Sequence, residues 1–175
     1  PPPDPREPWI AFSPALRALD QALLRASEGH EPALFLGAPG TGKLRAARRL
    51  HTLRHPDAPF GVLEAEAFAS RQDRLSLLVG GTVCLVGLHR LPEDQVSPLL
   101  QAFESPEGRR MAWMATAPRA DAVLPILLER LGVLRFTLPS LAERREDILP
   151  LFRSFLTTEA QSEGRTVPIL EPRHE

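Results

Sequence analysis

Short apolar runs alternate along this chain with segments in which apolar residues recur every three or four positions. The runs predict five β-strands, at residues 33–36, 60–64, 82–86, 111–117 and 134–138. The segments between and around them predict helices at residues 14–27, 44–53, 66–78, 92–103, 122–131 and 140–156. Strands that alternate with helices in this way indicate an α/β fold, with a mainly parallel sheet covered on both faces.

Several helix boundaries carry local signals. Ser13 precedes a proline and is expected to cap the first helix. Residues 140–143 have the spacing of a capping box, which would open the last helix. Two prolines restrict the helices that contain them. Pro98 favours a helix that begins with Ser97 as its N-cap, and Pro125 is tolerated only in a first turn.

A glycine-rich turn joins the first predicted strand to the next helix and is the strongest chemical signal in the chain. It consists of Gly37, Ala38, Pro39, Gly40, Thr41, Gly42 and Lys43. Glycines let backbone N–H groups curl around a phosphate, and Lys43 can reach the outer phosphates of a nucleotide. We therefore expect a nucleotide-binding P-loop; the alternative is a glycine- and proline-rich turn that contains a lysine by chance. Leu44 ends the expected cofactor-binding segment, although P-loop proteins carry Ser or Thr there for the metal.

Composition narrows the possible partners. With 175 residues, 43% apolar and 25% charged, the chain is long enough for one ordinary domain with a core. A formal charge of −1 gives no electrostatic case for direct nucleic-acid contact, and no apolar stretch is long enough to span a membrane. The single cysteine, Cys84, lies in an apolar run and is expected to be an inert core residue, which agrees with a cytoplasmic location.

The start of the chain differs from its middle. Residues 1–11 are rich in proline and are typical of an extended linker. Because the chain does not begin with Met, we expect it to be a piece of a longer protein.

A set of short motifs resembles one known family. They are Ser13-Pro14-Ala15-Leu16, Gly37 to Lys43, Pro59-Phe60, Gly80-Gly81-Thr82, Leu91-Pro92, Ala115-Thr116 and the run from Leu138 to Ile148. Together they make residues 12–164 similar to the AAA+ domain of bacterial sigma-54-dependent transcriptional activators, also called enhancer-binding proteins. The resemblance implies a three-layer αβα P-loop NTPase of the AAA+ large-subdomain type, in a cytoplasmic, ATP-binding protein that assembles into rings. The helical lid of the family would be missing, and residues 165–175 would begin the linker toward it.

The positions that carry ATP hydrolysis in this family are changed here. The family ends its third strand with an Asp-Glu pair that serves the magnesium ion and the attacking water. The matching residues are Val86 and Gly87, so we predict no catalytic residues and no metal ligands. Glu64 stands where the family has an Asn that controls the catalytic Glu. It either replaces the missing carboxylate or is a solvated residue at the end of a strand.

Two further positions leave alternatives open. The family directs two arginines at the nucleotide of the neighbouring subunit; Arg130 matches the second, and the first falls at Leu124. Arg130 is either a retained trans-acting arginine or part of a surface salt bridge. Thr116 matches the end of the fourth strand, near the sensor of the family. It either contacts a phosphate or has a purely structural role.

The loop with which family members grip sigma-54 has no counterpart in this chain. That loop carries Gly-Ala-Phe-Thr-Gly-Ala between the second and third strands, whereas residues 66–80 are too short and lack the motif. Contact with sigma-54 is therefore not expected, nor is direct contact with nucleic acid or a membrane.

The resemblance thus favours a degenerate AAA+ module with weak or no ATP hydrolysis. It would act in transcriptional regulation or protein assembly through other protein subunits, either by self-association or with a regulatory partner. The expected cofactor is ATP or ADP, bound weakly, with magnesium in doubt. Two alternatives stay open: a nucleotide-binding switch that does not hydrolyse ATP, and an active ATPase that borrows acidic groups from a neighbour or from Glu64.

Overall fold

Five parallel strands form one sheet, in the order β2-β3-β4-β1-β5. The computed structural model describes residues 9–162. The strands are β1 (Ala33–Leu36), β2 (Phe60–Glu64), β3 (Thr82–Val86), β4 (Ala112–Ala117) and β5 (Leu134–Thr137). Every pairing between them is parallel, and the first three strands have the bounds that the sequence predicted.

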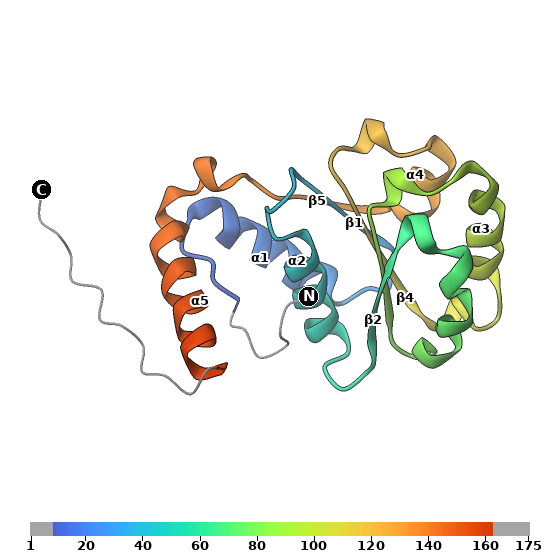
Figure 1. Ribbon diagram of the computed structural model, residues 1–175, viewed down its shortest axis with the longest axis horizontal. Helices are drawn as coiled ribbons and strands as arrows, with labels where there is room; N and C mark the ends of the chain where they lie inside the picture. The colour runs from blue at the N-terminus through green and yellow to red at the C-terminus, as the bar shows by residue number, and fades with distance from the viewer. Residues whose placement is uncertain (1–8, 163–175) are drawn as a thin grey trace, which may run out of the picture.

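Helices cover both faces of this sheet. They are α1 (Pro14–Ala26), α2 (Lys43–Arg54), α3 (Val96–Glu104), α4 (Pro125–Leu131) and α5 (Ile148–Ser162). In Figure 1, α1, α2 and α5 lie on one side of the sheet, and α3 and α4 lie on the other. The predicted three-layer α/β architecture is confirmed.

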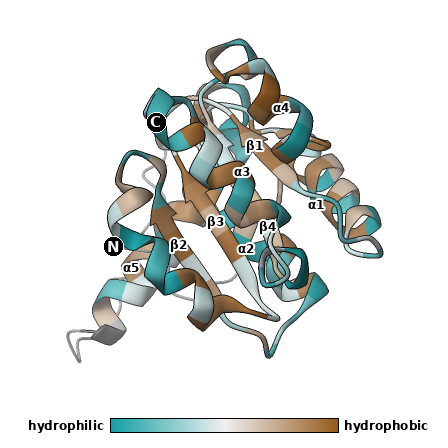
Figure 2. Ribbon diagram, turned by 90° about the vertical axis from the view of Figure 1, so that its right-hand side faces the viewer, coloured by the Kyte–Doolittle hydropathy of each residue, from teal (hydrophilic) through white to brown (hydrophobic). Residues whose placement is uncertain are grey.

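The strands separate two hydrophobic cores, because successive side chains point to opposite faces of the sheet. In β1, Leu34 and Leu36 pack into the core that contains α3 and α4, whereas Ala33 and Phe35 pack into the core that contains α1 and α2. Figure 2 shows the strands as predominantly hydrophobic. All four side chains of β1 are buried, which explains why this strand has no alternating pattern in the sequence.

Cys84 lies in the core that contains α1 and α2 and has no exposed surface. Burial raises the pKa of its thiol to about 12. The thiol therefore stays protonated at neutral pH, and the prediction of an inert core cysteine is confirmed.

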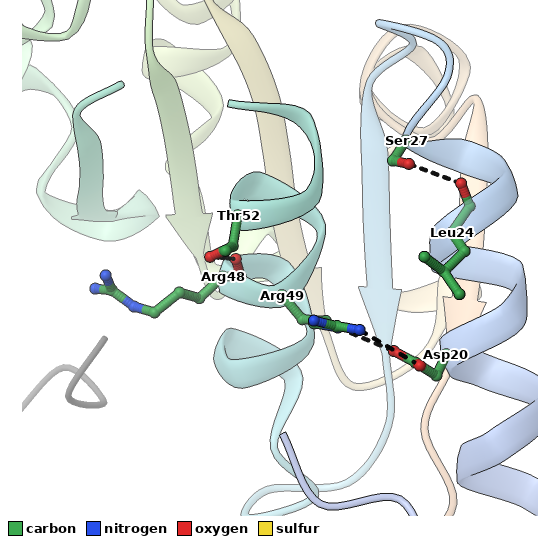
Figure 3. A network of polar contacts seen from close by, with 6 residues as sticks. All are labelled: Asp20, Leu24, Ser27, Arg48, Arg49 and Thr52. Carbon is green, nitrogen blue, oxygen red and sulfur yellow. Dashed lines mark hydrogen bonds and ion pairs between the residues drawn. The ribbon is translucent and has the colours of Figure 1, made fainter. Parts of the chain in front are cut away.

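Helix α2, which follows the glycine-rich turn, is fixed on two sides. Arg49 Nε lies 3.0 Å from Asp20 Oδ1 of α1, an ion pair drawn in Figure 3. The guanidinium of Arg48 points away from this pair (Figure 3) and lies over the ring of Phe60, 4.5 Å from its centroid. These contacts join α2 to α1 and to the start of β2.

The α-helix predicted at residues 66–78 is wrong. The chain forms two 3₁₀ helices there, Ala65–Ala67 and Ala69–Leu78. Phe68 and Leu75 are the large buried side chains of this segment. Because its apolar residues do not recur at a regular helical spacing, nothing in the packing requires a continuous α-helix.

Two other helices begin at different residues from those predicted. α3 begins at Val96 with Gln95 as its N-cap, so the N-cap predicted at Ser97 is wrong. Pro98 then lies in the first turn, where its missing N–H leaves no intrahelical bond unmade. α4 begins at Pro125, not at residue 122, and this proline occupies the first turn as its ring requires.

The last helix also begins later than predicted. The capping box between Ser140 and Glu143 is present, but it opens only a short 3₁₀ turn. Arg144 and Asp147 then turn inward and are 5% and 0% exposed. Because both side chains contact distant parts of the chain, α5 starts only at Ile148.

Asp147 joins the segment before α5 to the start of α1. Its Oδ1 accepts hydrogen bonds from the backbone N–H groups of Phe12 (2.8 Å) and Ser13 (2.7 Å), and its Oδ2 accepts one from the Ser13 hydroxyl (2.6 Å). Ser13 Oγ in turn accepts from the N–H of Leu16 and caps α1, as predicted. One buried carboxylate therefore orders both segments.

The linkers predicted at residues 1–11 and 165–175 fall outside the described residues, apart from residues 9–11. Within residues 9–162, no helix combines the length and the apolar character needed to cross a membrane.

We expect Asp147→Ala to lower the free energy of unfolding by about 3 kcal/mol, because the buried N–H of Ser13 and the part-buried N–H of Phe12 lose a charged acceptor. Urea unfolding followed by circular dichroism measures the loss. Asp121→Ala is the matched control, since Asp121 pairs with Arg119 at the surface and is 70% exposed. Its effect should stay within about 0.5 kcal/mol. Equal effects of the two changes would contradict the role of Asp147.

Candidate nucleotide-binding site

The glycine-rich turn connects the end of β1 to the first residue of α2. Gly37, Gly40 and Gly42 have φ angles of 149°, 78° and 92°, a region that residues with a Cβ rarely adopt. A Cβ on Gly37 would also lie 2.9 Å from the carbonyl oxygen of Leu138. Gly42 provides no side-chain cap for α2, so the positive end of this helix is available to an anion.

Lys43 lies over this turn. Its Nζ donates to the carbonyl oxygens of Gly37 (2.7 Å) and Ala38 (2.8 Å). Burial lowers the pKa of the amine, but the carbonyl contacts hold it at the mouth of the turn. Thr41 Oγ1 donates to the same Ala38 carbonyl at 2.9 Å. Lys43 and Thr41 thus fix the turn through its own carbonyl oxygens, and phosphate binding by this turn stays a prediction.

Arg144 supports the turn from the other side. Its Nη2 donates to the carbonyl oxygen of Thr41 at 2.7 Å, across 103 residues of sequence. Burial lowers the pKa of this guanidinium, which nevertheless stays charged at neutral pH. The sequence named Arg144 only as part of the run from Leu138 to Ile148. Its contact with Thr41 was not predicted, because a contact between residues so far apart leaves no local pattern in the sequence.

A cavity of about 130 Å³ opens beside the turn. Its lining is mainly apolar and includes Trp9, Ile10, Gly40, Thr41, Gly42, Leu138, Arg144, Leu151 and Phe155. Two buried donors of these residues lack a hydrogen-bond partner, namely Trp9 Nε1 and Arg144 Nε. An apolar cavity with a few polar groups is typical of a ligand site, although this one is smaller than the roughly 300–1,000 Å³ of most ligand pockets.

The ends of β3 and β4 meet beside this turn. The N–H of Gly87 donates to Thr116 Oγ1 at 3.0 Å, and the N–H of Gly37 donates to the carbonyl oxygens of Ala117 (3.3 Å) and Pro118 (3.1 Å). The structure thus brings together the turn and the predicted positions Thr116 and Gly87. The Thr116 hydroxyl is buried and supports Gly87; a phosphate contact for it stays a prediction.

The residues at this edge of the sheet do not fit a magnesium ion. Val86 and Leu44 have only carbon in their side chains, and Leu44 packs against the core that contains α1 and α2. Gly87 has no side chain, and a Cβ placed on it would lie 2.7 Å from Arg90 Nε. Among the described residues, no group of three His, Cys, Asp or Glu is placed to hold a metal. Magnesium requires oxygen ligands, and the carboxylates at this edge, Glu64 and Glu66, pair with Arg90.

Glu64 does not stand free at the end of β2. Its Oε2 lies 3.0 Å from Arg90 Nη2, and Glu66 Oε2 lies 3.4 Å from Arg90 Nη1. Glu64 pairs in register with Val86 on the neighbouring strand. Its carboxylate is therefore close to the site but is neutralised by Arg90.

Arg130 lies away from the turn of its own chain. It lies in the last turn of α4 and pairs with Glu104 of α3 at 3.1 Å, and both side chains are about half exposed. It also lines a cavity with Pro32 and Met111, residues that precede β1 and β4 and so lie at the opposite end of the sheet from Gly37. The surface ion pair is present, and a contact with a neighbouring subunit stays a prediction. Leu124, at the position of the other arginine, is 40% exposed.

The sheet order and the loop after β1 define an α/β P-loop fold of the AAA+ large-subdomain type. The solved structures agree. NtrX from Brucella abortus in complex with ADP matches with a TM-score of 0.78 at 21% identity, over 94% of this chain and 44% of that one. The P-loop NTPase domain of the sigma-54 transport activator from E. coli matches with a TM-score of 0.60 at 22% identity, over 75% of this chain and 99% of that one.

The curated relatives identify the family. HrpR of Pseudomonas syringae pv. syringae, a probable regulatory protein of a pathogenicity locus, is 30% identical over 79% of this chain and 56% of its own. NtrC of Salmonella typhimurium, a DNA-binding transcriptional regulator, is 28% identical over 98% of this chain and 45% of its own. No protein-family model matches the chain. The chain is homologous to the AAA+ domains of sigma-54 activators over most of its length, and it spans about half the length of these relatives.

We expect Gly87→Ala to lower the free energy of unfolding by about 1 to 2 kcal/mol, because φ is 75° there and a Cβ costs that much in the left-handed region. Gly80→Ala is the matched control: its φ is 81°, and its Cβ would meet nothing within 4 Å. It should show the same backbone cost without displacing Arg90. Urea unfolding of both variants tests this, and a Gly87→Ala chain as stable as the unaltered one would contradict it.

Proposed function

We propose that this chain is a degenerate AAA+ module that retains a nucleotide site but hydrolyses ATP weakly or not at all. It acts in transcriptional regulation or protein assembly through contacts with other protein subunits. One contrast carries the proposal. The phosphate-binding turn is complete, from Gly37 to Lys43, whereas the end of β3 presents Val86 and Gly87 beneath the guanidinium of Arg90.

Binding a phosphate and hydrolysing it require different groups, and the chain keeps only those for binding. Phosphates need backbone N–H groups, a helix N-terminus and a lysine, all of which the turn supplies. Hydrolysis also needs a metal ion at the phosphates and a group that orients the attacking water. Glu64 is the carboxylate that could take the second task, and it pairs with Arg90 at 3.0 Å at the surface. The active-ATPase alternative is the weakest of the three because Val86, Gly87 and Leu44 offer no side-chain oxygen to a metal ion.

Sigma-54 is not among the partners we propose. The segment between β2 and β3 consists of two short 3₁₀ helices, and it is anchored in the core by Phe68 and Leu75. A segment held in this way offers no long loop for gripping a partner.

A non-hydrolysing nucleotide switch is the second candidate, and the contacts of Arg144 favour it. NtrX was crystallised with ADP and with ATP, and the loop and cavity of this chain suit the same ligands. Arg144 bonds the carbonyl oxygen of Thr41 in the turn. Asp147, one 3₁₀ turn later, bonds the start of α1. A nucleotide that moved the turn would therefore move the segment that leads into α5.

Helix α5 could transmit such a movement to a partner. Ile148, Leu149, Phe152 and Phe155 are large apolar residues of α5, and each is about half exposed. Apolar groups gathered on one surface element are typical of a surface that contacts protein. We propose that other subunits of the assembly contact this helix.

Lys43 provides the test of nucleotide binding, since it is the only lysine of the chain. We expect ATP and ADP to bind in calorimetry and Lys43→Ala to reduce the affinity at least about tenfold, because a charge-assisted phosphate contact is lost. Arg109→Ala is the control; Arg109 is exposed and lines the cavity near Met111, at the other end of the sheet. Phosphate release should stay at the background rate throughout. ATP turnover that Lys43→Ala abolishes would overturn the proposal. Equal nucleotide affinity of the unaltered chain, Lys43→Ala and Arg109→Ala would show that the turn is not a nucleotide site.

Val86→Asp combined with Gly87→Glu is not expected to restore hydrolysis. The left-handed backbone at Gly87 disfavours glutamate, and Arg90 would pair with any new carboxylate. Leu44 would still offer no oxygen to a metal. Steady-state phosphate release measures the outcome, with Gly87→Ala as the control for backbone strain. Sustained turnover in the double variant would show that the acidic pair alone was missing.

A further inference from the structure

We propose that Arg90 takes the place of the metal ion, so that this chain binds the triphosphate of ATP without magnesium. The proposal rests on the retained nucleotide site described above and adds the group that neutralises the outer phosphates. The ligand class is therefore a free, metal-unbound nucleoside polyphosphate.

The position of Arg90 follows from the glycine three residues before it. Gly87 adopts a left-handed conformation and starts the short 3₁₀ turn Leu88–Arg90, in which the N–H of Arg90 donates to the Gly87 carbonyl oxygen at 2.8 Å. The side chain folds back over Gly87, so that Nε and Nη2 would lie 2.7 Å and 2.8 Å from a Cβ there. A residue with a side chain at position 87 would compete with the guanidinium for this space.

Two hydrogen bonds connect this point to the phosphate-binding turn. Gly87 donates to Thr116 Oγ1 at 3.0 Å, and the next residue, Ala117, accepts from the N–H of Gly37 at 3.3 Å. The backbone of Gly87 therefore lies at the same edge of the sheet as the turn, and the guanidinium of Arg90 lies beside Gly87 and contacts Glu64 and Glu66.

The electrostatics of His89 support this placement. Partial desolvation and the positive charges of both Arg90 and Lys43 lower the pKa of the imidazole, although His89 is exposed. Both cations therefore lie within electrostatic reach of His89. At neutral pH, His89 is then predominantly uncharged, and Arg90 and Lys43 remain to attract an anion.

The chemistry of arginine suits this role. A guanidinium offers a planar fork of donors that binds two phosphate oxygens at once. Arg90 is 45% exposed and pairs with Glu64 and Glu66, which are 51% and 52% exposed. Exposed ion pairs of this kind contribute little to stability, so a polyphosphate can displace these carboxylates from Arg90. A cation fixed here also disfavours a divalent metal at the same place.

Calorimetric titration of the chain with ATP, in excess magnesium and again in EDTA, tests the proposal. We expect the two affinities to agree within about twofold. Arg90→Ala should weaken binding in EDTA by about tenfold, because one bidentate phosphate contact is lost. The affinity of Arg90→Lys for ATP in EDTA should lie between those of the unaltered chain and Arg90→Ala, since lysine keeps the charge but not the planar pair of donors. Arg109→Ala should match the unaltered chain.

Glu64→Gln should change the affinity for ATP in the direction opposite to Arg90→Ala. Removing one competing carboxylate from Arg90 should tighten ATP binding in EDTA by about two- to threefold. A thermal melt of each variant confirms that the fold is retained; this is expected because the side chains of Glu64 and Arg90 are about half exposed.

The possible results separate this inference from the proposed function. Binding that requires magnesium, or an Arg90→Ala chain that binds as Arg109→Ala does, overturns the role of Arg90. If Lys43→Ala still weakens binding about tenfold in that case, the nucleotide site stands without the role of Arg90. A chain that binds ATP under neither condition overturns both the retained site and the role of Arg90.

Discussion

Strand β1 is the element on which the rest of the structure depends. Its side chains are buried on both faces, and it pairs with β4 on one side and β5 on the other. The carboxyl ends of parallel strands meet at one edge, so this pairing brings the glycine-rich turn against Ala117 and Leu138. The conformation of the turn therefore depends on the pairing of β1 in the sheet as well as on the glycines of the turn. A chain can lose its hydrolytic groups and still keep this loop, because the loop is part of the core topology.

A second constraint comes from two buried charges near the start of α5. Arg144 holds the turn through Thr41, and Asp147 holds the start of α1 through Phe12 and Ser13. A buried charge is costly unless it is paired or hydrogen-bonded, so each charge depends on its contacts in the folded chain. They make the N-terminal segment, the turn and the segment before α5 one unit.

Much of the fold could be predicted from the sequence, because its strands are short, apolar and bounded by breakers. β1, β2 and β3 have the predicted bounds, and the caps at Ser13 and Ser140 are present. The start of α5 could not be predicted, since it depends on contacts of Asp147 more than 130 residues away. Arg90 was missed for a related reason. The left-handed backbone of Gly87 and the ion pairs with Glu64 and Glu66 place that guanidinium, and none of these contacts leaves a local pattern in the sequence.

The central claim is that this site holds phosphate but does not cleave it. A single-turnover measurement, with the chain in excess over γ-labelled ATP and at high protein concentration, tests it most directly. We expect the labelled ATP to stay intact while it is bound, in magnesium and in EDTA alike. Release of labelled phosphate that magnesium accelerates and Lys43→Ala prevents would contradict the account.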